Sequence, residues 1–252
     1  MGIGDEIMAA GQARALREKT RRHVAIVDQR GKLRRHDIWI NNSDVAAALT
    51  SDCLRLLNCS GIRPYIASKT ATRWIWKPFK PTPARIVFYS QEEQFGQRHG
   101  TDKILIEPNV KAITHTNKEW FWERWQQLAD RHPGRFIQVG PANTRRLERV
   151  EYVLTTEFRQ AAAILKYALA YVGPEGGLHH AAAALGTPAV VLFGGFISPE
   201  STGYTLPNHR NLFTGGQACG MRVNCKHCRA AMDAITVDMV DQHLMEVVDE
   251  AR

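Results

Sequence analysis

The 252-residue sequence has no long hydrophobic run, no internal repeat and no low-complexity segment. No window approaches the roughly 18 continuous apolar residues that a transmembrane helix needs, and nothing at the N-terminus resembles a signal peptide. The five cysteines form no even set, which argues against a disulfide scaffold. These absences argue against a membrane-spanning chain and a small disulfide-rich secreted protein, so we expect a globular protein of the cytoplasm.

Negative charge is scarcer than positive charge. The 33 Lys and Arg exceed the 25 Asp and Glu, for a formal net charge of +8. The basic residues cluster at 14–22, 32–35 and 145–149 rather than in a tail. Solubility and the needs of a nucleotide-diphosphate site are the simpler explanation, and a DNA or acidic-glycan partner is compatible with the same charge.

Apolar residues make up 44% of the chain, which is enough for an ordinary core. Short β-type runs alternate with helical patterns, and this alternation predicts an α/β fold with parallel sheets and right-handed crossovers. Two such groups predict a first lobe over residues 1–100 and a second over 101–252, whose last helix could return towards the first lobe. The expected helices are 5–19, 43–49, 118–131, 157–168, 177–185 and 237–251. The expected strands are 24–28, 62–67, 85–89, 104–106, 136–139, 170–172 and 189–193.

Residues 171–195 have the most informative pattern: a strand, a glycine turn, a helix of small residues and a buried strand. Gly176 and Gly177 are expected to allow a tight turn through positive φ. The free N–H groups of the following helix suit a phosphate, and His179 and His180 stand at the same place. The pattern is common in α/β proteins, however, and a glycine turn alone binds nothing.

The same segment resembles the signature of glycosyltransferase family 9, the ADP-heptose:lipopolysaccharide heptosyltransferase family. There, an Asp-Ser/Thr-Gly-x-x-His-x-Ala-x-x-Leu-Gly-x-Pro string meets the sugar nucleotide. Glu175 stands in place of the family's aspartate, and Gly176 in place of a hydroxyl residue that would donate to phosphate. The resemblance implies a GT-B fold of two Rossmann-like lobes, with the N-terminal lobe reduced here. The matching residues are Glu175, Gly176, Gly177, Leu178, His180, Ala181, Leu185, Gly186 and Pro188.

The N-terminal Gly2-Ile3-Gly4-Asp5 resembles the family's Gly-x-Gly-Asp turn, which faces the acceptor. The resemblance implies that Asp5 is the general base, because inverting sugar transfer needs a carboxylate to take the acceptor hydroxyl's proton. On pattern alone, an aspartate after glycine at a helix start is an N-cap. Glu6 is the neighbouring substitute, on a different helix face. The family's opening strand is missing ahead of this turn, so the lobe is reduced or the true start lies upstream.

Residues 106–125 resemble the family's Pro-x-Ser/Gly loop and Lys-x-Trp-Pro helix. Thr116 and Lys118 match positions that contact the donor diphosphate, whose charge grows in the transition state. Trp120 and Trp125 match the family's tryptophans, with core packing as the alternative. Phe121 stands where the family has proline, so the helix entry is expected to differ.

The ribose partner in the family is often a glutamate after the strand at 136–140, and Glu148 or Glu151 is the candidate here. The Cys219, Cys225 and Cys228 thiols form a C-x5-C-x2-C pattern that, with a nearby histidine (His209 or His227), would make a structural zinc site. Buried or free thiols are the alternative. No catalytic metal is expected, because GT-B enzymes generally work without one.

These features predict a glycosyltransferase that moves a heptose or hexose from a nucleotide-diphosphate sugar to a hydroxyl acceptor and requires no cofactor. A sugar-nucleotide hydrolase or epimerase would use the same donor pocket. A nucleotide- or nucleic-acid-binding module without transferase activity is the alternative from another class. Lipopolysaccharide core is the family's usual acceptor, and modified DNA or another glycan is also compatible, as is peripheral contact with a membrane.

Overall fold

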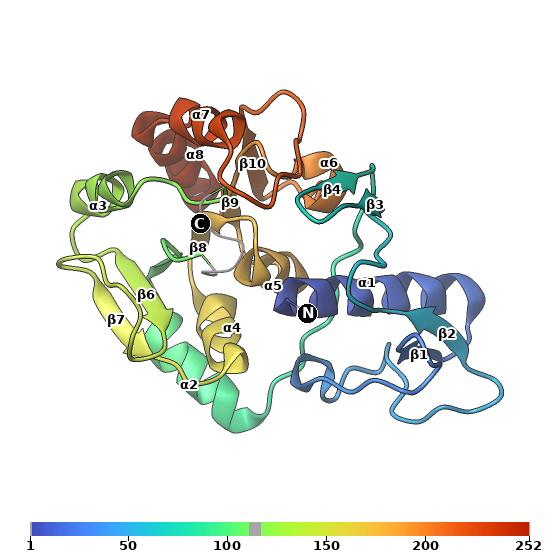
Figure 1. The fold of residues 1–252 in the computed structure, drawn as a ribbon. Helices are drawn as coiled ribbons and strands as arrows, with labels where there is room; N and C mark the ends of the chain where they lie inside the picture. The colour runs from blue at the N-terminus through green and yellow to red at the C-terminus, as the bar shows by residue number, and fades with distance from the viewer. Residues whose placement is uncertain (1, 111–116, 252) are drawn as a thin grey trace.

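The computed structural model describes residues 2–110 and 117–251 (Figure 1). Its centre is a six-stranded, all-parallel sheet, which confirms the predicted α/β class. The middle strands are continuous apolar runs, because a parallel strand covered on both faces has no side that favours polar residues. In spatial order the strands are β10 (His209–Phe213), β9 (Ala189–Phe193), β8 (Ala170–Pro174), β5 (Ile104–Ile106), β6 (Phe136–Gly140) and β7 (Glu151–Leu154).

Helices cover both faces of this sheet, and successive strand residues point to opposite faces. Val191 packs in one core with α4 (Phe158–Tyr167) and α5 (Gly177–Leu185). Val190 packs in the other core with α3 (Trp122–Arg131) and α8 (Val237–Glu250). In open α/β sheets of this kind, ligands bind at the carboxyl ends of the strands.

The N-terminal part forms a smaller lobe. It contains α1 (Ile3–Thr20), the parallel pair β1 (Val24–Val27) and β2 (Leu54–Leu57), and the antiparallel pair β3 (Ile66–Lys69) and β4 (Trp74–Trp76). A 3-10 turn, η1 (Asp37–Trp39), lies between β1 and β2. The first turn of α1 abuts α5 of the larger sheet (Figure 1).

Helix α2 (Ser90–Gly100) lies before the expected lobe boundary but packs against α4. A Cβ atom at Gly96 would lie 2.2 Å from the Ala163 carbonyl oxygen, and one at Gly100 would lie 2.3 Å from that of Ile164. Glycine is therefore needed where these two helices touch. Two short helices complete the fold, α6 (Pro199–Thr202) and α7 (Lys226–Ala234). None of the described helices is both long and apolar enough to cross a membrane.

Four local predictions were wrong. The segment 43–49 forms turns instead of a helix, because the Asn42 side chain accepts the Asp44 N–H at 2.9 Å and offers the backbone a local alternative. The segment 85–89 is not part of a strand, and the strand expected over 62–67 begins only at Ile66. Helix α3 begins at Trp122 instead of residue 118.

Candidate active site

A cavity of about 400 Å³ lies between the start of α1 and the carboxyl ends of β5 and β8. Its walls come from both lobes, because α1 and β4 face the strand ends of the larger sheet. Several predicted site residues line it together, although the first and last of them, Gly2 and His180, are 178 positions apart in sequence. They are Gly2, Gly4, Asp5, Lys118, Glu175, Gly176, Gly177 and His180.

Two helix N-termini meet at this cavity. A Cβ atom at Gly4 would lie 2.6 Å from His180 Cδ2, so glycine lets α1 approach α5. A Cβ at Gly177 would lie 3.0 Å from the Phe158 ring. Gly176 has an extended φ of 176°, so the predicted reason for the glycine pair, a positive φ, was wrong at Gly176. Unpaired N–H groups and the positive dipole ends of α1 and α5 make this a favourable place for an anion.

Lys118, Glu175 and His180 form a charged cluster beside these helix ends. Lys118 Nζ donates to a Glu175 carboxylate oxygen, and His180 Nε2 lies 3.4 Å from the other oxygen. Burial alone would raise the pKa of Glu175, but Lys118, with a smaller contribution from His180, more than offsets this effect and holds that pKa well below its usual range. Glu175 is therefore ionised, and the ammonium of Lys118 already faces an anionic partner.

Asp5 lines the cavity from the first turn of α1. Its Oδ2 accepts the Gly2 N–H at 3.1 Å, so Gly2 occupies the N-cap position and Asp5 caps from within the helix. Its Oδ1 accepts the hydroxyl of Tyr65 and lies 3.3 Å from Arg63 Nε. Burial and the neighbouring Asp5 raise the pKa of Tyr65, so its hydroxyl stays a donor. With these contacts made, the Asp5 side chain is still 29% exposed and can be reached from the cavity.

Glu6 faces away from the cavity, as expected for the next residue of a helix. It is buried, and Arg34 holds it through bonds of 2.9 and 3.2 Å. Asn58 also donates to its carboxylate at 2.8 Å. Glu6 thus anchors α1 to the small lobe and does not reach a ligand in this cavity.

A third carboxylate in the cavity, Glu107, was missed from sequence. It follows β5 directly, and its Oε2 accepts the Tyr171 hydroxyl at 2.5 Å. Burial raises the pKa of Glu107 to about 7, although the Tyr171 bond opposes the rise. A Cβ at Gly173 would lie 2.2 Å from the Tyr171 hydroxyl, so glycine makes room for this pair. A carboxylate placed just after a parallel strand was the signal that could have identified it.

A smaller cavity of about 270 Å³ adjoins the first and shares Glu107, Asn109 and Phe158 with it. Leu178 lines this second cavity, opposite the ends of β6 and β7. Glu157, before α4, is the other carboxylate in its wall and was also missed.

Neither candidate ribose glutamate lies in a cavity wall. Glu148 is exposed, and its backbone N–H bonds to the Gln126 side chain. Glu151 is also exposed and lies 3.2 Å from Lys103 Nζ. Thr116, the other predicted diphosphate contact, lies outside the described residues.

Aromatic side chains form the small-lobe side of the first cavity. Trp76 stacks near Tyr65 at a centroid distance of 6.3 Å and meets the edge of Phe196 at 5.3 Å. The tryptophans of the family pattern have a different role: Trp120 and Trp125 are buried, with ring centroids 4.6 Å apart, and line neither cavity. Core packing is therefore the correct reading of both.

Two groups of described residues have metal-ligand chemistry. Glu175, His179 and His180 offer atoms within 4.8 Å of one another, but Glu175 is already paired with Lys118. Burial lowers the pKa of His179, which is therefore neutral. The cysteines before α8 form the second group outside both cavities, and the histidine among them is His227, whereas His209 lies in β10.

Comparison with known proteins identifies a family and structures of similar fold. The family model described as glycosyltransferase family 9 (heptosyltransferase) matches residues 87–233. E. coli ADP-heptose LPS heptosyltransferase II has a similar structure, with a TM-score of 0.50 and 19% identity over 70% of this chain and 54% of that one. The family 9 glycosyl transferase from Veillonella parvula DSM 2008 has a TM-score of 0.53 and 18% identity over 68% and 55%.

The chain therefore spans about half the length of these two structures. No curated protein sequence matches it significantly. The family model covers more than half of the 252 residues and includes Lys118, Glu175 and His180, which meet in the cavity. The chain belongs to glycosyltransferase family 9.

Proposed function

We propose that the chain transfers a heptose or hexose from a nucleotide-diphosphate sugar to a hydroxyl acceptor, with inversion at the anomeric carbon. One observation carries this proposal: a carboxylate of the small lobe, Asp5, faces the same cavity as Lys118 and His180 of the large lobe. A base and a diphosphate site in one cavity suit a displacement reaction, in which both reactants must be held in one geometry.

The donor fits the two adjoining cavities. The nucleoside would occupy the smaller one, where Leu178 and Phe158 offer apolar contact and Glu157 a carboxylate for ribose. The diphosphate would lie at the N-terminus of α5, beside Lys118, and the sugar would extend into the larger cavity. A bound diphosphate would compete with Glu175 for the Lys118 ammonium.

The reaction then needs one base. Asp5 takes the proton of the acceptor hydroxyl as its oxygen bonds to the anomeric carbon, and the bond from that carbon to the diphosphate breaks on the opposite face. Lys118 and the α5 N–H groups stabilise the charge that grows on the leaving diphosphate. The Tyr65 hydroxyl and Arg63 hold Asp5 in place before the transfer.

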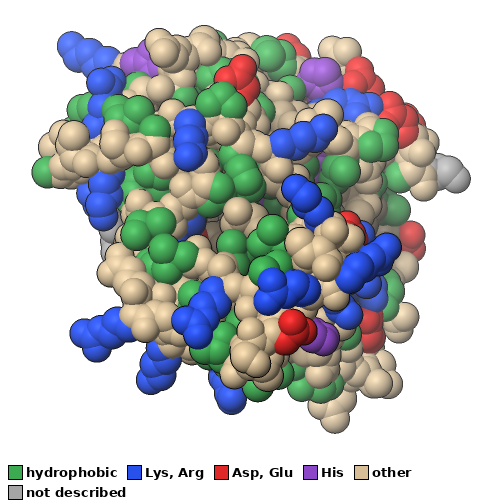
Figure 2. Space-filling model, turned by 90° about the vertical axis from the view of Figure 1, so that its right-hand side faces the viewer, with side chains coloured by type: hydrophobic (Ala, Val, Ile, Leu, Met, Phe, Trp, Pro, Cys, Tyr) green, Lys and Arg blue, Asp and Glu red, His purple; other side chains and the backbone are tan. Residues whose placement is uncertain are grey.

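The charge of the small lobe favours an anionic acceptor. Residues 21–84 hold 12 Lys and Arg, four Asp and no Glu, so this segment alone carries a charge equal to that of the whole chain. Figure 2 shows basic side chains spread over one face of the molecule with few acidic ones. Phosphorylated lipopolysaccharide core is the acceptor we favour, and duplex DNA is the competing polyanion. Both would bind less tightly as salt rises.

The test combines a donor panel with two matched variants. ADP-, GDP- and UDP-sugars are incubated with lipopolysaccharide core or duplex DNA, and released nucleotide and glycosylated product are measured by mass spectrometry. Asp5→Asn should keep donor affinity and lose transfer by roughly 100-fold or more, the usual contribution of a general base. Asp52→Asn, a change at an exposed carboxylate of the same lobe, should leave both unchanged.

Other outcomes separate the alternatives. Nucleotide release without any glycosylated product would indicate a hydrolase. Nucleotide binding without turnover, in the wild type and in Asp5→Asn alike, would indicate a binding module and refute the proposal. Equal transfer by Asp5→Asn and the wild type would refute the role of Asp5.

A further inference from the structure

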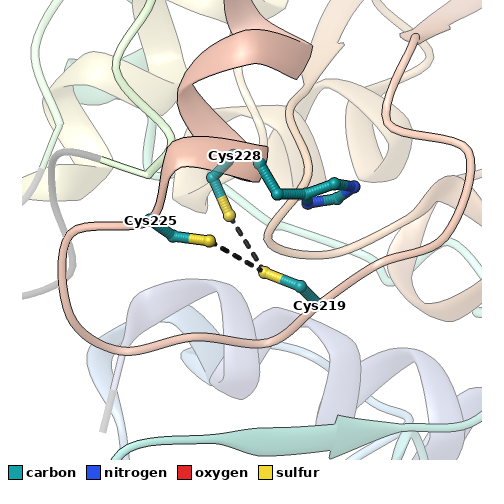
Figure 3. A group of neighbouring side chains, drawn as sticks. Cys219, Cys225 and Cys228 are labelled. Carbon is teal, nitrogen blue, oxygen red and sulfur yellow. Dashed lines mark hydrogen bonds between the residues drawn. The ribbon is translucent and has the colours of Figure 1, made fainter.

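Three cysteines and a histidine form a compact group on the loop after β10 and the first turn of α7 (Figure 3). Cys219 Sγ lies 3.8 Å from Cys225 Sγ and 3.1 Å from Cys228 Sγ. His227 adds a ring nitrogen, and all four ligand atoms lie within 4.8 Å of one another. Sulfurs bound at about 2.3 Å to one tetrahedral zinc ion stand about 3.8 Å apart, whereas a disulfide bond is about 2.05 Å long. The spacing is therefore close to that of a metal site.

The surroundings orient these side chains as ligands. His227 Nε2 lies 2.9 Å from the Gly215 carbonyl oxygen, so Nε2–H donates to it and Nδ1 is left as the ligand atom. Histidine ligands are commonly fixed in this way by a second hydrogen bond. Cys225 stands at the N-cap position of α7 and Cys228 lies in its first turn, so the start of this helix holds two of the sulfurs close together. The Met221 N–H also points to Cys219 Sγ, at 3.5 Å.

We propose that Cys219, Cys225, His227 and Cys228 bind one zinc ion. Three thiolates and one imidazole are a closed tetrahedral donor set typical of structural zinc. Cys228 is completely buried and none of the four residues lines either cavity, so the ion supports the fold and is not placed to touch a substrate. The site stands independently of the proposed transfer reaction.

The loop that carries these ligands is bonded to the cavity walls. Its Cys219 and Gly220 N–H groups donate to the carbonyls of Gly195 and Phe196, at 2.7 and 2.9 Å. Its Gly220 carbonyl accepts the Trp74 N–H of β4 at 2.9 Å. Since Phe196 and the β4 residue Trp76 line the first cavity, the ion would fasten a loop that braces both walls.

A second set of hydrogen bonds connects the same loop to Asn117, the residue before Lys118, which we propose binds the diphosphate. The Asn117 side chain accepts the Cys225 N–H at 3.1 Å and donates to the Met221 carbonyl at 2.6 Å. Asn117 directly precedes Lys118 in the chain, so the loop that carries the cysteines also fixes the backbone next to Lys118. Loss of zinc should therefore lower nucleotide affinity without removing any residue of the cavity.

The experiment measures metal in the purified full chain by mass spectrometry. We expect one zinc ion per chain in the wild type and in Cys59→Ser, a matched change at a buried cysteine of the small lobe. Cys225→Ser should lose most of the zinc, and Cys225→His should retain it, because imidazole is an equivalent ligand. A chelator should lower the melting temperature of the wild type but not that of Cys225→Ser.

Wild-type measurements alone keep the test decisive if a variant fails to fold. Replacement of the ion by cobalt(II) should give the visible absorption of tetrahedral thiolate ligation. A wild type without bound metal, or with iron in place of zinc, would overturn the proposal. Equal zinc content in the wild type, Cys59→Ser and Cys225→Ser would place the ion elsewhere and overturn it as well.

Discussion

Replacement of Glu107 by glutamine gives a stability difference that depends on pH. Glu107 is half-buried at the junction of the two cavities, and burial raises its pKa from the ordinary 4.5 to about 7. Glutamine has nearly the same shape and keeps an oxygen for the Tyr171 hydroxyl, but it never ionises. The variant therefore isolates the cost of placing a charge at this position.

The sign follows from the direction of the shift. Below about pH 4.5 the carboxyl group is neutral in the folded and the unfolded chain, so wild type and variant differ least. Between pH 4.5 and 7 the unfolded chain ionises first, and the wild type loses stability. Above pH 7 the loss is complete, at about 2–3 kcal/mol after allowance for partial exposure. At roughly 2–4 °C per kcal/mol, Glu107→Gln should melt about 4–12 °C above the wild type there.

Scanning calorimetry from pH 4 to 8.5 measures this difference. Effects of the buried histidines cancel, because both proteins contain them. Glu148→Gln, at an exposed carboxylate outside both cavities, is the matched control and should show no such pH trend. A melting difference that stays constant from pH 4 to 8.5, or that shrinks above pH 7, would refute the assignment of a buried, neutral-pH carboxyl group to Glu107.

Three further changes test the site and its frame. Lys118→Met should weaken nucleoside diphosphate binding roughly 10- to 100-fold in calorimetry, the worth of a charge-assisted bond, whereas Lys19→Met, at an exposed lysine, should not. Gly4→Ala should lower the free energy of unfolding by about 1–3 kcal/mol, because the added methyl group would push α1 away from His180. Gly2→Ala should change it little, because a Cβ there would meet nothing closer than 3.6 Å. Equal free energies of unfolding for the two variants would contradict the close approach of α1 to α5. Trp120→Phe should lower the free energy of unfolding by about 1–3 kcal/mol, because it removes the hydrogen bond to the Ile235 carbonyl, but it should not change nucleotide affinity. A tenfold drop in nucleotide affinity would instead place Trp120 in the donor site.

The large sheet was predictable where burial leaves a local pattern. Helix α5 and strand β9 begin and end at the predicted residues, because small and β-branched residues are needed where elements pack on both sides. Strands β7 and β10 were missed. They lie at the two edges of the sheet, and their buried residues follow no regular alternation. Hydrogen bonds to their neighbours, β6 and β9, order them.

The candidate site divides in the same way. Asp5, Lys118 and His180 could be predicted because each belongs to a short motif next to a helix start. Tyr65 could not, because its partner Asp5 is 60 residues away and no local pattern links the two. The placement of Trp76 in the cavity likewise depends on β4 folding back across the lobes, which is a tertiary event.

The two departures from the family string act on one ion pair. Gly176 brings no hydroxyl to a phosphate, so in the proposed donor complex phosphate binding would depend on backbone N–H groups and on Lys118. Glu175 pairs with Lys118 in the free protein, so a diphosphate would compete with it for the three N–H donors of that ammonium. A diphosphate that took all three would leave Glu175 buried with only His180 at 3.4 Å, which is costly unless another donor replaces the ammonium. In the proposed placement, with the sugar in the larger cavity, a sugar hydroxyl would supply that bond and the released nucleoside diphosphate would have no sugar there to do so. We therefore expect the intact donor to bind more tightly than the spent one.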